Sequence, residues 1–238
     1  MKIVVCAKQV PDTTEVKLDP KTNTLIRDGV PSIINPDDKA DVALREALAM
    51  GCDDALLISD RAFGGADTWA TSSTIAAALK KLDYDVIITG RQAIDGDTAQ
   101  VGPQIAEHLG IPQVSYVEKM DVEGEDTLVV QRQFEDRHQI IEVKTPCLLT
   151  ALAELADPRY MSVHGVFDAY REKEVKVWGL EDIKDTVNEG NIGLKGSPTR
   201  VKKSFTKQAK GAGTILNDLS DDEAVAAIVE KLQEKHII

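Results

Sequence analysis

Short apolar runs alternate with helical repeats along the first 150 residues of the chain. The apolar runs cover residues 3–6, 55–58, 86–88 and 148–149. Residues 41–50 and 67–81, which lie between them, have the spacing of amphipathic helices. Strands that are apolar on both faces and alternate with helices are typical of a parallel sheet covered on both sides. The pattern therefore predicts an α/β fold with a mostly parallel sheet.

The helix expected near residues 67–81 has a recognisable start and one apolar side. Asp67 or Thr68 would cap its first turn. A single apolar stripe, suited to docking on the sheet, is formed by Ile75, Ala78, Leu79 and Leu82.

Two other stretches alternate apolar and polar residues around a turn. Residues 16–30 do so around a turn at 19–23, and residues 127–134 pair with 138–144 in the same way. This alternation predicts two antiparallel β-hairpins added to the parallel sheet.

The pattern changes after Thr150. Residues 190–213 are rich in glycine, lysine, serine and threonine and lack a core of their own, yet residues 221–235 have one apolar face and predict a short helix. In a purely disordered tail, an apolar helix face would have nothing to pack against. We therefore expect an α/β domain over residues 1–155, and over residues 156–238 a C-terminal arm that packs on a partner subunit.

The segment from residue 84 to 102 favours a specific ligand. A strand ends at Gly90 and runs into a polar turn that opens a helix. Unpaired N–H groups at such a helix start carry partial positive charge and can bind a nucleotide phosphate. Asp97 or Thr98 would cap this helix and Gly110 would end it, although Pro103 also allows a regular helix that begins at the proline.

Composition limits the partners that the chain can bind. The net charge is -12 over 238 residues, which leaves no basic stripe for a nucleic acid. No apolar run approaches the length of a membrane span, and residues 1–6 read as a first strand, which predicts a cytoplasmic protein. Cys6, Cys52 and Cys147 are odd in number and lie in or beside apolar segments, so we expect reduced thiols that fill core space.

Several motifs occur in a fixed order and together resemble a known family. They are residues 6–12 (CAKQVPD), 35–38 (NPDD), 47–51 (ALAMG), 90–95 (GRQAID), 130–135 (VQRQFE), 146–150 (PCLLT) and 157–160 (DPRY). Over nearly its whole length the chain resembles the β subunit of an electron-transfer flavoprotein. The resemblance implies a Rossmann-like, adenine-nucleotide-hydrolase-like fold, and a heterodimer with an α subunit that carries FAD.

The second nucleotide of this family divides it into two branches. It is AMP, a structural cofactor, in respiratory members and a second FAD, reduced by NADH, in electron-bifurcating members. Residues 59–68 (SDRAFGGADT) resemble the flavin-binding loop of the bifurcating branch, so we expect FAD, with AMP as the alternative. The cofactor-binding residues that the resemblance implies are Cys6, Ala7 and Lys8; Asn35, Pro36, Asp37 and Asp38; Asp60, Phe63, Gly64, Asp67 and Thr68; and Arg91, Gln92, Ala93, Ile94, Asp95, Gly96, Asp97, Thr98, Ala99, Gln100, Val101 and Gly102 in the phosphate loop.

Residues 159–167 resemble the recognition loop with which this family docks a dehydrogenase. An apolar and aromatic character suits an interface anchor. The alternative is a segment buried against this subunit or the α subunit. The docking residues would be Arg159, Tyr160, Met161, Val163 and Phe167.

The polar side chains of the chain give no independent catalytic site. Asp95 and Asp97 could ligate a metal, but such carboxylates are commoner in turns and caps, and we expect no metal. Lys8 and Arg91 could hold a phosphate or stabilise a reduced flavin, or could be surface cations; Arg91 is the better candidate. The four histidines lie on unrelated elements and no nucleophile turn is evident, so the chemistry must belong to a cofactor.

The chain departs from the family between Asp38 and Asp41. The family has a helix, a strand and a Met-Gly-Pro turn there, whereas here the two flanking motifs are joined directly. Loss of a central strand would leave an apolar gap in the sheet. We therefore expect that the protein has this segment and that the residue numbering skips it, rather than that the segment is deleted. A true deletion would affect part of the nucleotide pocket.

The resemblance implies a specific function. Hydride transfer from NADH to FAD would be followed by transfer of one electron to ferredoxin and one, through the α-subunit FAD, to a docked acyl-CoA or 2-hydroxy-acid dehydrogenase. The alternative is a conventional carrier in which this chain holds structural AMP. A nucleotide-binding sensor of the same fold is a remote alternative, because a sensor needs neither a recognition loop nor an arm.

Overall fold

The computed structural model describes residues 1–8, 10, 17–18, 25–26, 41–202, 211, 213, 215, 217 and 219–238. The chain divides into two compact units, Met1–Lys202 and Lys203–Ile238. The first unit thus extends past the expected boundary at residue 155, because residues 163–197 contribute buried side chains such as Ala169 and Ile183 to it. That the rest of the chain packs on a partner stays a prediction.

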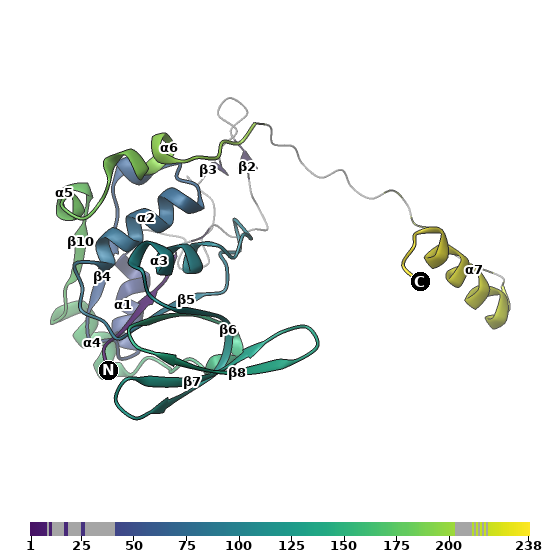
Figure 1. Cartoon of the computed structure of the whole chain (residues 1–238), viewed down its shortest axis with the longest axis horizontal. Helices are drawn as coiled ribbons and strands as arrows, with labels where there is room; N and C mark the ends of the chain where they lie inside the picture. The colour runs from purple at the N-terminus through teal and green to yellow at the C-terminus, as the bar shows by residue number, and fades with distance from the viewer. Residues whose placement is uncertain are drawn as a thin grey trace. The chain divides into compact units, whose positions relative to one another are not determined.

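The main sheet of the first unit confirms the predicted α/β fold (Figure 1). Its strands, in spatial order, are β1 (Ile3–Cys6), β5 (Val86–Gly90), β9 (Cys147–Ala151), β6 (Gln113–Glu123), β7 (Thr127–Gln133) and β8 (His138–Lys144). β1, β5, β9 and the start of β6 run parallel, whereas β6, β7 and β8 are antiparallel. The second predicted hairpin is therefore confirmed as β7 and β8, and the long strand β6 joins it to the parallel part.

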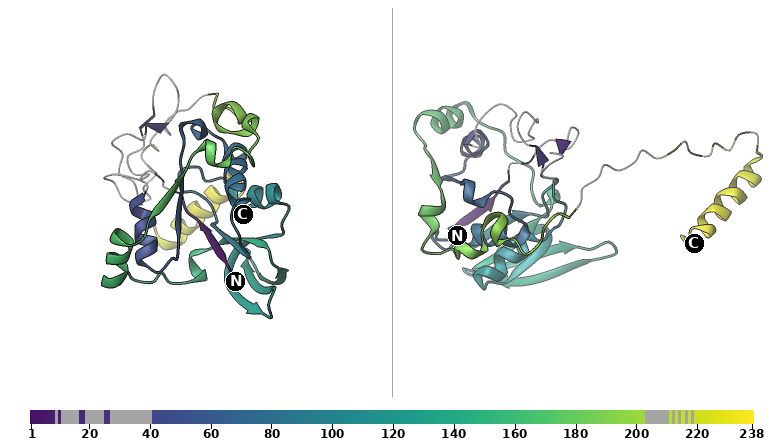
Figure 2. Two further views of the ribbon diagram at one scale, coloured as in Figure 1. Left: turned by 90° about the vertical axis from the view of Figure 1, so that its left-hand side faces the viewer. Right: turned by 90° about the horizontal axis from the view of Figure 1, so that it is seen from above.

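Two helices, α2 (Thr68–Leu79) and α3 (Val101–Leu109), cover one face of the parallel strands. Figure 2 shows this layer from two further directions. The core between helices and sheet contains Leu79 of α2, Ile105 of α3 and Ile87 of β5, all almost fully buried. Burial of each such side chain contributes roughly 1.5–3 kcal/mol, so this layer fixes the starts of both helices relative to the strand ends.

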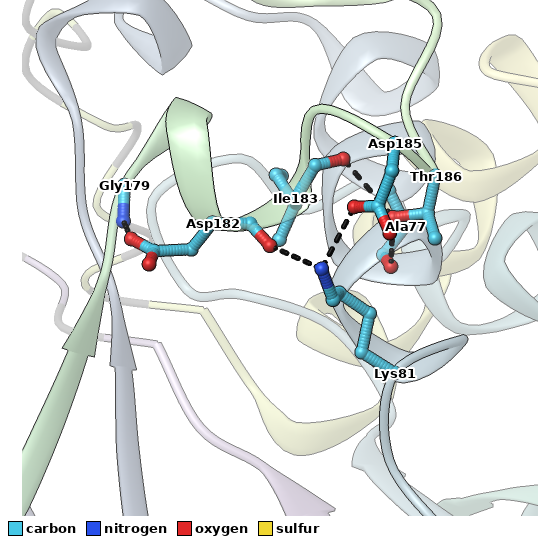
Figure 3. Close-up of polar contacts among 7 residues, drawn as sticks. All are labelled: Ala77, Lys81, Gly179, Asp182, Ile183, Asp185 and Thr186. Atoms are coloured by element: carbon cyan, nitrogen blue, oxygen red, sulfur yellow. Dashed lines mark hydrogen bonds and ion pairs between the residues drawn. The ribbon is translucent and has the colours of Figure 1, made fainter.

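Helix α2 is buried on two sides. Ile75, Leu79 and Leu82 of the predicted stripe pack in the core on the main sheet, as expected, whereas Ala78 packs elsewhere. Leu79 faces the main sheet, whereas Ala77 and Ala78 pack on Ile183 of α5 (Leu180–Ile183). Figure 3 shows the hydrogen bonds and the ion pair that join the chain around α5 to the end of α2. There Lys81 donates from Nζ to the Asp182 carbonyl and to Asp185 Oδ1, each at 2.7 Å.

Strand β4 (Ala55–Ile58) lies outside the main sheet, which corrects the expectation of one continuous parallel sheet. It pairs in parallel with β10 (Val175–Trp178), and α1 (Asp41–Ala49) and α4 (Val163–Arg171) pack beside that pair. Within the described residues, β1 pairs with β5 alone, and Val5 on β1 is 65% exposed.

The remaining described elements are a short hairpin, a terminal helix and several short helical turns. The first predicted hairpin is confirmed as β2 (Lys17–Leu18) paired with β3 (Leu25–Ile26). The terminal helix is confirmed as α7 (Asp221–Glu234), which begins with a capping box between Ser220 and Glu223. Short turns of helix are η2 (Arg61–Phe63), η3 (Ala153–Leu155), η4 (Glu189–Asn191) and α6 (Gly193–Gly196). Among the described residues, no helix has the length and apolar character needed to cross a bilayer.

The cysteines are free thiols, as predicted, but they differ in exposure. Cys147 is fully buried and Cys6 partly so, whereas Cys52 is exposed, so the expectation that all three fill core space was wrong for Cys52. Burial raises the pKa of both Cys6 and Cys147 from 9.0 to about 11. Both thiols are therefore protonated at neutral pH.

We expect iodoacetamide to label Cys52 first. Only the thiolate is nucleophilic, and the raised pKa of Cys6 and Cys147 leaves them with roughly 100-fold less thiolate at pH 8 than a thiol with the ordinary pKa. Mass spectrometry of the folded protein should therefore show one modified cysteine, and three after denaturation. Equal labelling of Cys6 in the folded protein would contradict its burial.

Candidate functional site

Three of the predicted cofactor-binding segments meet at the carboxyl ends of the parallel strands. Lys8, just after β1, donates from Nζ to both carboxylate oxygens of Asp95, at 2.7 and 2.9 Å. The Thr68 hydroxyl at the start of α2 donates to Gln100 Oε1 at 3.2 Å. In open α/β sheets ligands bind at this edge. The structure therefore brings residues 6–8, 60–68 and 91–102 together where a nucleotide is expected.

The start of α3 leaves its first N–H groups without a side-chain cap. The helix begins at Val101 with Gln100 as N-cap, and Gln100 makes no capping bond, so the predicted cap by Asp97 or Thr98 was wrong. Asp97 instead accepts a bond from the Gln92 amide. Pro103 fits in the first turn, where its missing N–H is not needed, and Gly110 ends the helix as predicted. Uncapped N–H groups are suited to an anion.

The loop before α3 has a strained backbone. Asp97 and Ala99 both have φ of 52°, in the left-handed region that residues with a β-carbon rarely adopt. Each such residue costs on the order of 1–3 kcal/mol, and strain of this kind is concentrated at ligand sites. This cost is consistent with a loop shaped for a ligand.

Gly102 lets α3 approach the strands closely. A β-carbon at this position would lie 2.6 Å from Thr89 Oγ1 on β5 and 2.8 Å from Thr150 Cγ2 on β9. The Thr89 hydroxyl is buried and has no hydrogen-bond partner among the described residues. A buried donor without a partner is unfavourable, so this hydroxyl and the uncapped helix fit a bound nucleotide.

The loop at residues 60–68 is held by a later segment, residues 178–199, which we call the strap. Leu180 N–H donates to Asp60 Oδ2 at 2.9 Å, and Leu194 N–H donates to the Gly64 carbonyl at 3.0 Å. Backbone N–H groups of Ala62 and Leu180 lower the pKa of Asp60. The polar groups of Asp60 and Gly64 are thus engaged by this chain, so their direct contact with a cofactor stays a prediction.

Asp67 caps α2, as predicted. Its Oδ1 accepts from the Ala70 N–H at 3.0 Å, and its Oδ2 accepts from Thr199. Burial acts to raise the pKa of Asp67, but these hydrogen bonds outweigh burial and hold the pKa below 3.8. The ionised carboxylate occupies the α2 start, so α3 offers the better phosphate site.

The other predicted cofactor residues lie at different depths. Phe63 packs against the core cluster around Ile183, whereas Arg91 is exposed and its N–H donates to the Ala151 carbonyl. Asn35, Pro36, Asp37 and Asp38 lie outside the described residues. Within the part of the chain that is described, His, Cys, Asp and Glu side chains form no group of three that could hold a metal.

The predicted docking residues form an exposed apolar surface on the loop at 157–161 and on α4. Tyr160 is 97% exposed and Phe167 is 50% exposed, with the Arg171 guanidinium 4.7 Å from the Phe167 ring. A hollow of about 510 Å³ lies beside them, lined by Met50 and residues 157–161. In this chain the surface is thus open to a partner.

Sequence reasoning missed α4 itself. Its signal was Ser162, whose side chain accepts from the Gly165 N–H and caps the helix. It also missed Ser197 and Thr199, because their partner Asp67 lies about 130 residues earlier.

Comparisons with known proteins decide the family. The electron transfer flavoprotein domain matches residues 33–183. The electron transfer flavoprotein subunit beta of Clostridium acetobutylicum is 58% identical over 264 residues, which cover all of both chains. The chain belongs to the electron transfer flavoprotein β-subunit family. This confirms the resemblance inferred from the motifs.

Other relatives of this β subunit have more specific names. The caffeyl-CoA reductase-Etf complex subunit CarD of Acetobacterium woodii is 51% identical, and the acryloyl-CoA reductase electron transfer subunit gamma of Anaerotignum propionicum is 46% identical, each over all of both chains. The Clostridium alignment has 264 positions and this chain has 238 residues, so at least 26 positions have no counterpart here. A difference of this size fits the helix and strand expected after Asp38.

Proposed function

We propose that this β subunit binds FAD and works in flavin-based electron bifurcation. Electrons would pass from NADH to ferredoxin and, through the FAD of an α subunit, to or from a partner dehydrogenase. The observation that carries the proposal is the junction of residues 6–8, 60–68 and 91–102 at the strand ends, tied by Lys8–Asp95 and Thr68–Gln100. The names of the caffeyl-CoA and acryloyl-CoA reductase relatives support a role in such complexes.

Bound FAD would supply the redox chemistry, in which one hydride brings two electrons that leave one at a time; the residues of this chain would bind and orient it. The N–H groups at the start of α3 and the Arg91 side chain would hold the diphosphate. Exposed Ile94 in the phosphate loop would contact an apolar part of the cofactor, and the surface around Tyr160 would dock the dehydrogenase.

The alternative is a conventional β subunit that holds structural AMP. The uncapped α3 start favours a phosphate, and both nucleotides carry one. FAD is preferred because residues 59–68 resemble a flavin-binding loop, and because AMP alone would leave that loop without a ligand.

The test is the nucleotide content of this chain purified together with its α subunit. Absorbance and chromatography of the released nucleotides should give two FAD per heterodimer and no AMP. NADH should then reduce ferredoxin when the dehydrogenase and its oxidised substrate are present to accept the second electron. One FAD and one AMP would support the conventional carrier instead, and a heterodimer without any nucleotide in this chain would refute both.

A further inference from the structure

We propose that Thr199 is a positioning residue that holds Asp67, and through it the 60–68 loop, in the geometry that binds the cofactor. This inference rests on the proposed function, and it concerns a residue that lies far from the loop in sequence. Two hydrogen bonds join the residues: the Thr199 N–H donates to Asp67 Oδ2 at 2.9 Å, and the Thr199 hydroxyl donates to the same oxygen at 2.7 Å.

A second residue of the strap holds the backbone of Asp67. The Asp67 N–H donates to Ser197 Oγ at 2.8 Å, and the Ser197 hydroxyl donates to the Gly193 carbonyl at 2.7 Å. Ser197 is buried, so its hydroxyl has little freedom to find another partner. Backbone and side chain of Asp67 are therefore both fixed from the strap.

Helix capping alone does not need these contacts. The capping bond uses Asp67 Oδ1 and the Ala70 N–H, whereas the bonds from Thr199 use the other carboxylate oxygen. Hydrogen bonds to a charged acceptor are about twice as strong as neutral ones. Thr199 therefore fixes the rotation of the carboxylate group, which the capping contacts from the Ala70 and Trp69 backbone leave less defined.

The neighbour of Asp67 connects it to the phosphate loop. Thr68 follows directly in the chain, and its hydroxyl donates to Gln100, the N-cap of α3. A change in the Asp67 backbone therefore moves Thr68 relative to the N–H groups at the start of α3. Through these contacts Thr199 sets the spacing of the two loops that would bind the cofactor.

The chain offers a matched control for Thr199. The Thr186 hydroxyl joins the strap to the same helix, since it donates to the Ala77 carbonyl at 2.8 Å, but it does so at the opposite end of α2 (Figure 3). Thr199→Val and Thr186→Val each remove one hydroxyl between strap and α2. Thr199→Ser keeps the hydroxyl and serves as the conservative variant.

The affinity for FAD should separate these variants in the complex with the α subunit. We expect Thr199→Val to raise the Kd of the cofactor held by this chain about tenfold, which equals about 1.4 kcal/mol. Thr199→Ser and Thr186→Val should stay within about twofold of the wild type. Wild-type affinity in Thr199→Val, or an equal loss in Thr186→Val, would overturn the proposal.

Hydrogen exchange in the nucleotide-free complex separates this inference from the proposed function. The Ala70 amide should exchange faster in Thr199→Val than in the wild type, and at the wild-type rate in Thr186→Val. Unchanged exchange at Ala70 would overturn the positioning role. A wild-type complex that binds no nucleotide would instead overturn the proposed function, and with it the expected change in affinity.

Discussion

Gly102→Ala is expected to destabilise the first unit by about 1–3 kcal/mol and to abolish nucleotide binding by this chain. The new β-carbon would lie 2.6 Å from Thr89 Oγ1 and 2.8 Å from Thr150 Cγ2, both on strands whose interior is closely packed. Relief of these contacts requires α3 to move away from β5 and β9. The N–H groups at the start of α3 would then no longer lie where a phosphate is held.

Gly96→Ala is the matched control for this prediction. Gly96 lies in the same loop, and a β-carbon there would meet nothing within 4 Å. Thermal unfolding and nucleotide content of both variants should be compared in the complex with the α subunit. Gly96→Ala should resemble the wild type in stability, and Thr89→Ala added to Gly102→Ala should recover part of the loss. Equal stability of Gly102→Ala and the wild type would contradict the close approach of α3.

Features that depend on local signals were predicted correctly. The Asp67 cap, the left-handed Gly110 after α3 and the hairpin of β7 and β8 each depend on a few neighbouring residues. The same holds for the parallel strands β1, β5 and β9, whose apolar runs are visible one by one. The family followed from ordered motifs, which the comparisons confirm.

Features that depend on distant residues could not be predicted. The sequence of residues 190–213 predicted a segment without a core, yet Ser197 and Thr199 form hydrogen bonds with Asp67. The sequence could not predict this, because a hydroxyl side chain in a glycine-rich segment does not indicate which residue it will bond. The pairing of β4 with β10 could not be predicted either, because the apolar run at residues 55–58 could pair with any neighbouring strand. The predicted capping residue of α3 was wrong because the chain does not enter the helix directly after Asp97 and Thr98. A strained loop, in which Asp97 and Ala99 have left-handed backbone angles, precedes the helix.

Tyr160→Asp and Phe167→Asp are expected to reduce electron delivery to the dehydrogenase by about 30-fold each, with cofactor content unchanged. Exposed aromatic side chains at the centre of an interface commonly contribute about 2 kcal/mol or more, which corresponds to that factor. Tyr160 is almost fully exposed, so its replacement removes no contact that the fold needs. Phe167 is half exposed and lies against Arg171, so its variant tests the same surface from α4.

Ile140→Asp is the control, because Ile140 is an exposed apolar residue on β8, away from this surface in sequence and on a different element. Steady-state reduction of the dehydrogenase should be measured at increasing dehydrogenase concentration for all three variants. A docking surface predicts a higher KM for the dehydrogenase in Tyr160→Asp and Phe167→Asp and a wild-type KM in Ile140→Asp. Because Tyr160 is open to solvent, a loss of flavin in Tyr160→Asp would instead mean that the loop packs on the α subunit, the alternative that its apolar character also allows.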